Sequence, residues 1–142
     1  MKNLSPSLTA DDKIRLSFGA NPKEDINLEA LELAHLLVDT VLDKKASDII
    51  ILDLREQSVL TDYFLLCNGD SNRQINAIAD AVQEDAKQKA DVIIMNKEGD
   101  PNSGWVLLDF GDLIVHVFSP EKRAYYDLEG LWHESHVVLR MQ

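Results

Sequence analysis

One stretch of this sequence, residues 105–118, constrains the fold more than any other part of the chain. It reads WVLLDFGDLIVHVF, two short apolar runs on either side of a glycine. Such a pattern predicts a β-hairpin with a tight two-residue turn at Phe110 and Gly111, because glycine tolerates the positive φ angle that the turn requires. The chain therefore contains an antiparallel pair of strands, whose alternating side chains define two faces.

The two faces of the predicted hairpin differ in chemistry. Cross-strand pairing of Asp109 with Asp112, Leu107 with Ile114 and Trp105 with His116 places these six side chains on one face. The other face holds only aliphatic side chains, those of Val106, Leu108, Leu113, Val115 and Val117, and must belong to the core. Two carboxylates cannot be fully buried without partners. The mixed face is therefore either covered in part by a helix, with only its aspartate end in water, or a binding surface.

The elements around the hairpin predict a single α/β domain of the mixed, α+β kind. Apolar periodicity and capping residues indicate helices that begin near Asn27, at Ser71 and at Ser119, and strands at Ile49–Leu52, Tyr63–Cys67 and Val92–Met95. The loop between the first two strands is too short for a parallel crossover, so we expect these strands to be antiparallel. The order α-β-β-α-β-β-β-α then gives a mixed five-stranded sheet flanked by helices.

Charge restricts the partners of the chain. Its 142 residues include 14 basic and 25 acidic side chains, a net charge of −11, and all of this excess lies after residue 27. Phosphate backbones repel such a surface, whereas basic proteins are attracted to it. The acidity thus disfavours direct nucleic-acid binding and favours a basic protein partner, although the same charge can serve solubility alone. The apolar runs are too short to span a membrane.

Residues 1–26 are predicted to be a flexible tail, and residues 27–142 the folded domain. The tail mixes serine, proline, glycine and charge without periodicity, and it lacks the apolar segment of a secretory signal. The single Cys67 lies in an apolar run, and no third ligand lies near His133 and His136. We therefore expect no disulfide, no metal and no cofactor, and a cytoplasmic location.

The last predicted helix adds aromatic side chains to the candidate site. It opens with Ser119 as N-cap and Pro120 at the first helical position, and it carries Tyr126 and Trp132 further along. Tyrosine and tryptophan are common anchors of protein interfaces, and they also often cover a small core.

Four segments, taken together and in this order, resemble the ribosomal silencing factor family of Iojap-related proteins. They are ASDIIILDLRE, TDYFLLCNGDSNRQ, GWVLLDFGDLIVHVF and RAYYDLEGLW, and the resemblance covers about residues 29–132. It implies a translational repressor that binds the large ribosomal subunit through the basic ribosomal protein uL-fourteen. Bound there, such a protein blocks joining of the small subunit, and it also aids assembly of the large subunit.

The resemblance and the mixed face together predict the partner-binding residues. They are Trp105, Asp109, Asp112, His116, Tyr126 and Trp132. The tryptophan at position 105 supplies apolar contact, and the aspartates meet lysine or arginine of the partner. An exposed hairpin or edge strand could also support a homodimer that competes with ribosome binding.

An enzymatic function is the alternative. The strand, turn and helix around Gly69 and Ser71 resemble the opening of nucleotidyltransferase folds, in which a helix N-terminus holds a phosphate. Asp109 and Asp112 would then be metal ligands. This chemistry needs paired carboxylates beside the phosphate site, and the predicted strand after the helix offers none. We therefore expect a nucleotidyltransferase-like fold without catalytic residues, in a protein that is not an enzyme.

Overall fold

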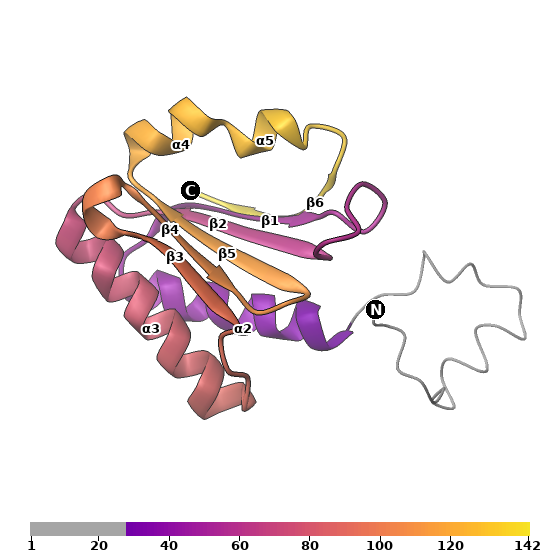
Figure 1. The fold of residues 1–142 in the computed structure, drawn as a ribbon, viewed down its shortest axis with the longest axis horizontal. Coiled ribbons are helices and arrows are strands. Elements are labelled where there is room, and N and C mark those ends of the chain that lie inside the picture. The colour runs from indigo at the N-terminus through magenta and orange to yellow at the C-terminus, as the bar shows by residue number, and fades with distance from the viewer. Residues whose placement is uncertain (1–27) are drawn as a thin grey trace, which may run out of the picture.

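The computed structural model describes residues 28–142, in which a six-stranded mixed sheet lies between two pairs of helices (Figure 1). The helices are α2 (Leu28–Asp43), α3 (Asn72–Ala90), α4 (Pro120–Tyr126) and α5 (Leu128–Leu131). The strands are β1 (Ser47–Asp53), β2 (Tyr63–Asn68), β3 (Asn96–Asp100), β4 (Trp105–Asp109), β5 (Leu113–Phe118) and β6 (His136–Met141). The predicted tail and the predicted N-cap at Asn27 lie outside the described residues.

The sheet has the strand order β3-β4-β5-β2-β1-β6. Only the central pair, β2 and β5, is parallel, and every other neighbouring pair is antiparallel. The antiparallel return from β1 to β2 and the mixed α+β class are confirmed, but the sheet has six strands where the sequence predicts five. Within residues 28–142, no helix is long and apolar enough to cross a membrane.

The larger core lies between the sheet and the helices α2 and α3. Each helix buries a stripe at helical spacing: Ala30, Leu33, Ala34, Leu37, Val38 and Val41 on α2, and Ile75, Ile78, Ala79, Val82 and Ala86 on α3. The aliphatic face of the hairpin packs against these stripes, with Val106, Leu108, Leu113, Val115 and Val117 all buried. The assignment of this face to the core is therefore confirmed. The helix α3 also begins as predicted, because Ser71 Oγ accepts the Gln74 backbone N–H at 3.1 Å.

The predicted register of the hairpin is wrong by two residues. The observed pairs are Trp105 with Phe118, Leu107 with His116 and Asp109 with Ile114. The turn is centred on Gly111 and Asp112, because Phe110 N–H donates to the carbonyl of Leu113 at 2.9 Å and the Phe110 side chain enters the core. The Asp109 carboxylate holds this turn by accepting the Gly111 N–H at 2.7 Å. A shift of two residues keeps every side chain on its predicted face.

The third strand begins four residues later than predicted. Val92 and Ile94 pack against the core outside any strand, and β3 consists of the five exposed residues after Met95. The turn that follows sets its register: the Asp100 carboxylate accepts the Ser103 N–H at 3.1 Å, and Gly104 adopts a φ of 78°. This capped turn places Asp100 opposite Trp105, so β3 is a polar edge strand of the sheet.

The C-terminal part of the domain also departs from the prediction. The single predicted helix is broken at Asp127, whose φ of 46° separates α4 from α5. The segment after Trp132, expected to be a short extension, contains β6, which pairs with β1 on the opposite edge from β3. This strand is difficult to predict from the sequence, because its apolar and polar side chains do not alternate strictly and it follows a helix.

Candidate functional site

The candidate site lies on the face of the sheet that α4 and α5 cover in part (Figure 1). The strand registers place nine side chains on this face of β3, β4 and β5, which we call the outer face: Asn96, Glu98, Asp100, Trp105, Leu107, Asp109, Ile114, His116 and Phe118. A second, smaller core cluster lies beside these residues on the same face of the sheet, next to α5, and shares Phe118 with them; it includes Ile50, Leu52, Leu54, Phe64, Leu66 and Phe118.

Trp105 is the centre of an aromatic cluster on the outer face. Its ring stacks on Phe118 with the centroids 5.1 Å apart and contacts Tyr126 of α4 at 4.5 Å. Its indole Nε1–H donates to His116 Nδ1 at 3.1 Å. The side chain is nevertheless only half-buried. Trp105 is thus held by three neighbours and still reaches the surface, as an interface anchor must.

His116 lies beneath Trp105 and is only 3% exposed. Its ring packs edge-on against Phe64 of β2, with centroids 4.5 Å apart. Burial lowers the pKa of His116 to about 3, and the positive charge of Arg123 adds to this effect, so the ring is neutral at neutral pH. In this structure His116 therefore contacts Trp105 and does not reach the surface where we predicted a partner to bind.

The two predicted residues of the last helical segment lie on opposite sides of this cluster. Tyr126 is 44% exposed and packs directly on Trp105. Trp132 is half-buried and meets Phe64 edge-on at 6.0 Å, on the far side of His116. Tyr126 and Trp105 therefore form one continuous surface. Trp132 is connected to this surface only through the buried rings of Phe64 and His116.

The two aspartates lie at the tip of the hairpin, away from the aromatic cluster. Along β4, Asp109 is four positions from Trp105, a distance of about 13 Å. The Asp109 carboxylate holds the turn, and the Asp112 carbonyl accepts the N–H groups of Asp62 and Tyr63, both at 3.0 Å. The structure thus brings Trp105, His116 and Tyr126 together, and it places Asp109 and Asp112 in a separate, acidic part of the same ribbon.

A shallow pocket beside Trp105 is absent from the sequence prediction. It has a volume of about 200 Å³ and is lined by Glu98, Gly99, Ser103, Trp105, Leu107 and Tyr126. Glu98 is exposed, and its Oε2 accepts the side-chain N–H of Asn96 at 2.8 Å. The sequence contains the clue in the turn DPNSG, because Asp100 and Gly104 mark a hairpin whose first strand must include Glu98.

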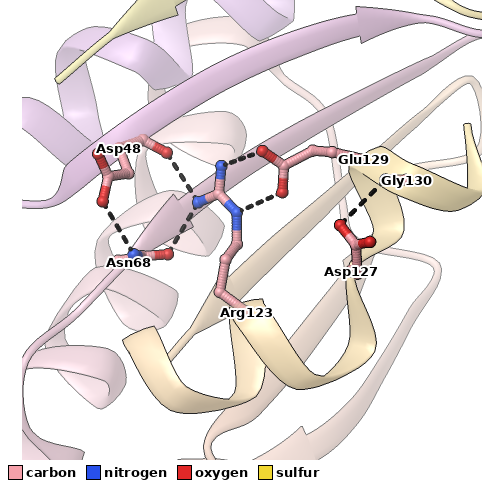
Figure 2. Close-up of polar contacts among 6 residues, drawn as sticks. All are labelled: Asp48, Asn68, Arg123, Asp127, Glu129 and Gly130. Carbon is pink, nitrogen blue, oxygen red and sulfur yellow. Dashed lines mark hydrogen bonds and ion pairs between the residues drawn. The ribbon is translucent and has the colours of Figure 1, made fainter. Parts of the chain in front are cut away.

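Arg123 fixes the helices α4 and α5 on the sheet (Figure 2). Its guanidinium donates to Glu129 of α5 at 2.8 and 3.1 Å, to Asn68 Oδ1 of β2 at 2.8 Å, and to the Asp48 carbonyl of β1 at 2.7 Å. The Arg123 side chain is 11% exposed, so these bonds form in a partly dry environment. These partners on β1 and β2 are 75 and 55 residues away in the sequence, so no local pattern predicts them.

At the start of α3, where the enzymatic alternative expects a phosphate, side chains of the protein accept two of the backbone N–H groups. The Asp70 N–H donates to Gln74 Oε1 at 2.6 Å, and the Gln74 N–H donates to Ser71. Residues 28–142 contain no group of three or more His, Cys, Asp or Glu side chains that could hold a metal ion. Burial raises the pKa of the Cys67 thiol to about 12, so this thiol is not a nucleophile at neutral pH.

Comparisons with known proteins agree with this fold and these segments. The family model "Ribosomal silencing factor during starvation" matches residues 27–142. A ribosomal silencing factor from Halalkalibacterium halodurans is 41% identical over 107 residues, which cover 75% of this chain and 91% of that protein. A crystal structure of a Chromobacterium violaceum protein, 41% identical, superimposes with a TM-score of 0.70 over 73% of this chain and 86% of that one.

A more distant relative has a name that refers to ribosome assembly. The mouse protein "Mitochondrial assembly of ribosomal large subunit protein 1" is 29% identical over 144 aligned positions, which cover 91% of this chain and 61% of the relative. The family match extends over every described element, from α2 to β6. This chain therefore belongs to the ribosomal silencing factor family.

Proposed function

We propose that this protein is a translational repressor that binds the large ribosomal subunit through ribosomal protein uL-fourteen and sterically blocks joining of the small subunit. Membership of the silencing factor family, matched across residues 27–142, is the observation that carries the proposal. Obstruction requires affinity and bulk but no catalytic group, so the proposed activity is not enzymatic. The name of the mouse relative supports a further role in assembly of the large subunit.

The charge of the chain supports a basic protein as the direct partner. A net charge of −11 repels ribosomal RNA and attracts a basic ribosomal protein embedded in it. Recognition of such a protein by shape and charge also explains how an acidic domain can bind a particle that consists largely of RNA.

The pocket beside Trp105 is the part of the outer face best suited to a basic side chain. Trp105 and Leu107 offer an apolar wall, and Glu98 offers a carboxylate at the rim. A lysine or arginine can lay its methylene stem along the wall and place its charge at the carboxylate. We therefore add Glu98 and Leu107 to the predicted contact residues, with Asp109 and Asp112 extending the acidic surface towards the hairpin tip.

Cosedimentation with separated ribosomal subunits tests the proposal. The wild-type chain should pellet with the large subunit alone, and its presence should lower the yield of joined ribosomes when small subunits are added. Glu98→Lys should weaken binding about tenfold or more, because it places a positive charge against a basic partner. Glu84→Lys makes the same charge change on α3, on the other side of the sheet, and should bind like the wild type.

Two outcomes would contradict the proposal. One is binding to the small subunit, or to naked ribosomal RNA as tightly as to the large subunit. The other is a specific calorimetric signal with ATP or GTP and Mg²⁺ that disappears in Ser71→Ala or Asp109→Asn, which would support the nucleotide-binding enzyme. Equal loss of binding in Glu98→Lys and Glu84→Lys would show that only total charge matters and that the pocket is not the contact.

A further inference from the structure

The contact between His116 and Trp105 has an unusual hydrogen-bond pattern. The indole Nε1–H of Trp105 donates to His116 Nδ1 at 3.1 Å, so Nδ1 must be the unprotonated nitrogen of the ring. A neutral imidazole then carries its proton on Nε2. Among the described residues, His116 Nε2 is the one buried side-chain nitrogen or oxygen that lacks a hydrogen-bond partner.

An unpaired buried N–H group is costly, and an apolar side chain at position 116 would avoid it. The surroundings would suit such a side chain, because Phe64 and Phe118 both pack against the imidazole ring. Protonation cannot relieve the cost, since burial and the charge of Arg123 lower the pKa of His116 to about 3. Histidine at this position is therefore not explained by the stability of the core.

What the imidazole does provide is an acceptor for the indole. Trp105 is the first residue of β4, directly after a turn, and its ring extends over the outer face between Phe118 and Tyr126. Stacking alone fixes the plane of the ring but does not select between the two χ2 orientations, about 180° apart, that point Nε1 in opposite directions. A hydrogen bond to a rigid, buried acceptor selects one of them, and a side chain that is already in its bound orientation loses less entropy on association.

We infer that His116 is a positioning residue that holds the Trp105 indole in its partner-binding orientation, at the expense of one unsatisfied donor in the core. This inference rests on the proposed function only in one respect, the expectation that binding to the large subunit depends on the orientation of Trp105. The positioning itself is a property of the isolated protein. Partner contact is then made by Trp105, while His116 acts through it.

The test compares His116→Leu with His116→Asn in the full chain. Leucine fills the site without an acceptor, whereas the Asn carbonyl oxygen lies near the position of Nδ1 and retains one. Thermal unfolding is measured first. The exchange with solvent of the two indole N–H protons is then followed by NMR, and the Trp105 resonance is assigned through its loss in Trp105→Phe. The chain has only two tryptophans, so Trp132 serves as the internal control.

We expect His116→Leu to be at least as stable as the wild type, to exchange its Trp105 indole proton about tenfold faster or more, and to leave Trp132 unchanged. We also expect about tenfold weaker cosedimentation with the large subunit. His116→Asn should restore part of the protection of the Trp105 indole. Trp105→Phe should weaken binding, and adding His116→Leu to it should weaken binding little further, because the hydrogen bond is already lost.

Unchanged protection of the Trp105 indole in His116→Leu would overturn the inference. Strict additivity of the two substitutions, or a loss of binding that merely follows a loss of stability, would do the same. Should His116→Leu fail to fold, His116→Val, a smaller β-branched side chain that also lacks an acceptor, replaces it in each measurement. If the wild type does not bind the large subunit at all, the proposed function fails, yet the indole exchange still tests the positioning.

Discussion

Trp105 and Val115 lie on the same ribbon of strands but on opposite faces, and their truncation should separate interface from core. Val115 is fully buried against the α2–α3 side, so Val115→Ala should cost about 1–3 kcal/mol of unfolding free energy. Trp105→Ala uncovers His116 and should cost only about 1 kcal/mol of stability. It should nevertheless weaken binding by about 2 kcal/mol or more, roughly thirtyfold, as at an aromatic hot spot.

Thermal unfolding and large-subunit cosedimentation, measured on the same preparations, give both quantities. The assignment of the two faces to different roles is contradicted if Trp105→Ala melts the domain, or if it binds as tightly as the wild type.

The buried state of His116 predicts how stability depends on pH. The pKa of His116 is about 3 in the folded protein against 6.5 for an ordinary histidine, so the unfolded chain binds more protons between these values. The contribution of His116 to the unfolding free energy should therefore be constant above about pH 7 and fall as the pH drops below 6.5, by up to about 2 kcal/mol at pH 5. His116→Leu should lose this part of the pH dependence, which urea titrations of both proteins at pH 7 and pH 5 would detect. Parallel losses in the two proteins would place the dependence in other groups.

At the scale of residues, the sequence predicts the face of the hairpin on which each side chain lies, but not how deeply that side chain is buried. Alternation assigns Trp105 and His116 to one side of the hairpin and Val115 to the other, and the error of two residues in the register leaves this intact. The burial of His116 depends on Phe64, in a strand that is a neighbour only through the parallel pairing of β2 and β5. No local pattern in the sequence contains that contact.

At the scale of elements, the edges of the sheet are the hardest to predict. The interior strands β1, β2, β4 and β5 are largely apolar and lie close to their predicted positions, whereas the edge strand β3 is polar and exposed and the edge strand β6 is mostly exposed. Edge strands need few apolar side chains, so periodicity says little about them. For this reason the shallow pocket and Glu98, which depend on the placement of β3, could not be found from the apolar pattern alone.

The helices α4 and α5 should depend on Arg123 for their attachment to the sheet. Arg123→Ala removes the partner of Glu129 and Asn68, and we expect a loss of about 2 kcal/mol of unfolding free energy, because the guanidinium is largely but not fully shielded from water. Hydrogen exchange should rise across α4 and α5 and not across α2 and α3. Binding to the large subunit should also weaken, since Tyr126 moves with α4.

The control for this clamp is Lys89→Ala, which breaks the exposed ion pair between Lys89 and Asp85 on α3. It should change stability by less than about 0.5 kcal/mol. Uniformly faster exchange in Arg123→Ala, spread over the whole domain, would show that Arg123 supports global stability and not the local attachment of α4 and α5.

At the scale of the whole molecule, the two sides of the sheet have different roles. The side covered by α2 and α3 contains most of the buried apolar side chains, whereas the side under α4 and α5 has a smaller core and ends in exposed aromatic and acidic groups. Because the larger core on the α2–α3 side supplies most of the stability, side chains on the other side of the sheet can serve contact with a partner. The net charge of −11 then acts over the entire surface and governs encounter more than fold.

This separation predicts how salt affects binding. Raising the ionic strength from about 50 mM to about 300 mM shortens the screening length from roughly 14 Å to 6 Å, so wild-type affinity for the large subunit should fall, mainly through slower association. Trp105→Ala should be weaker at every salt concentration but lose affinity with the same slope, because it removes apolar contact and no charge. Glu98→Lys should be weaker at low salt and less sensitive to added salt. Association and dissociation rates on immobilised large subunits, measured across this range of ionic strength, give the salt dependence of affinity for the wild type and for each variant. If the wild type binds independently of salt, the acidic surface does not guide it to a basic partner; if Trp105→Ala changes the slope as much as Glu98→Lys does, apolar and charged contacts cannot be assigned to separate residues on this face.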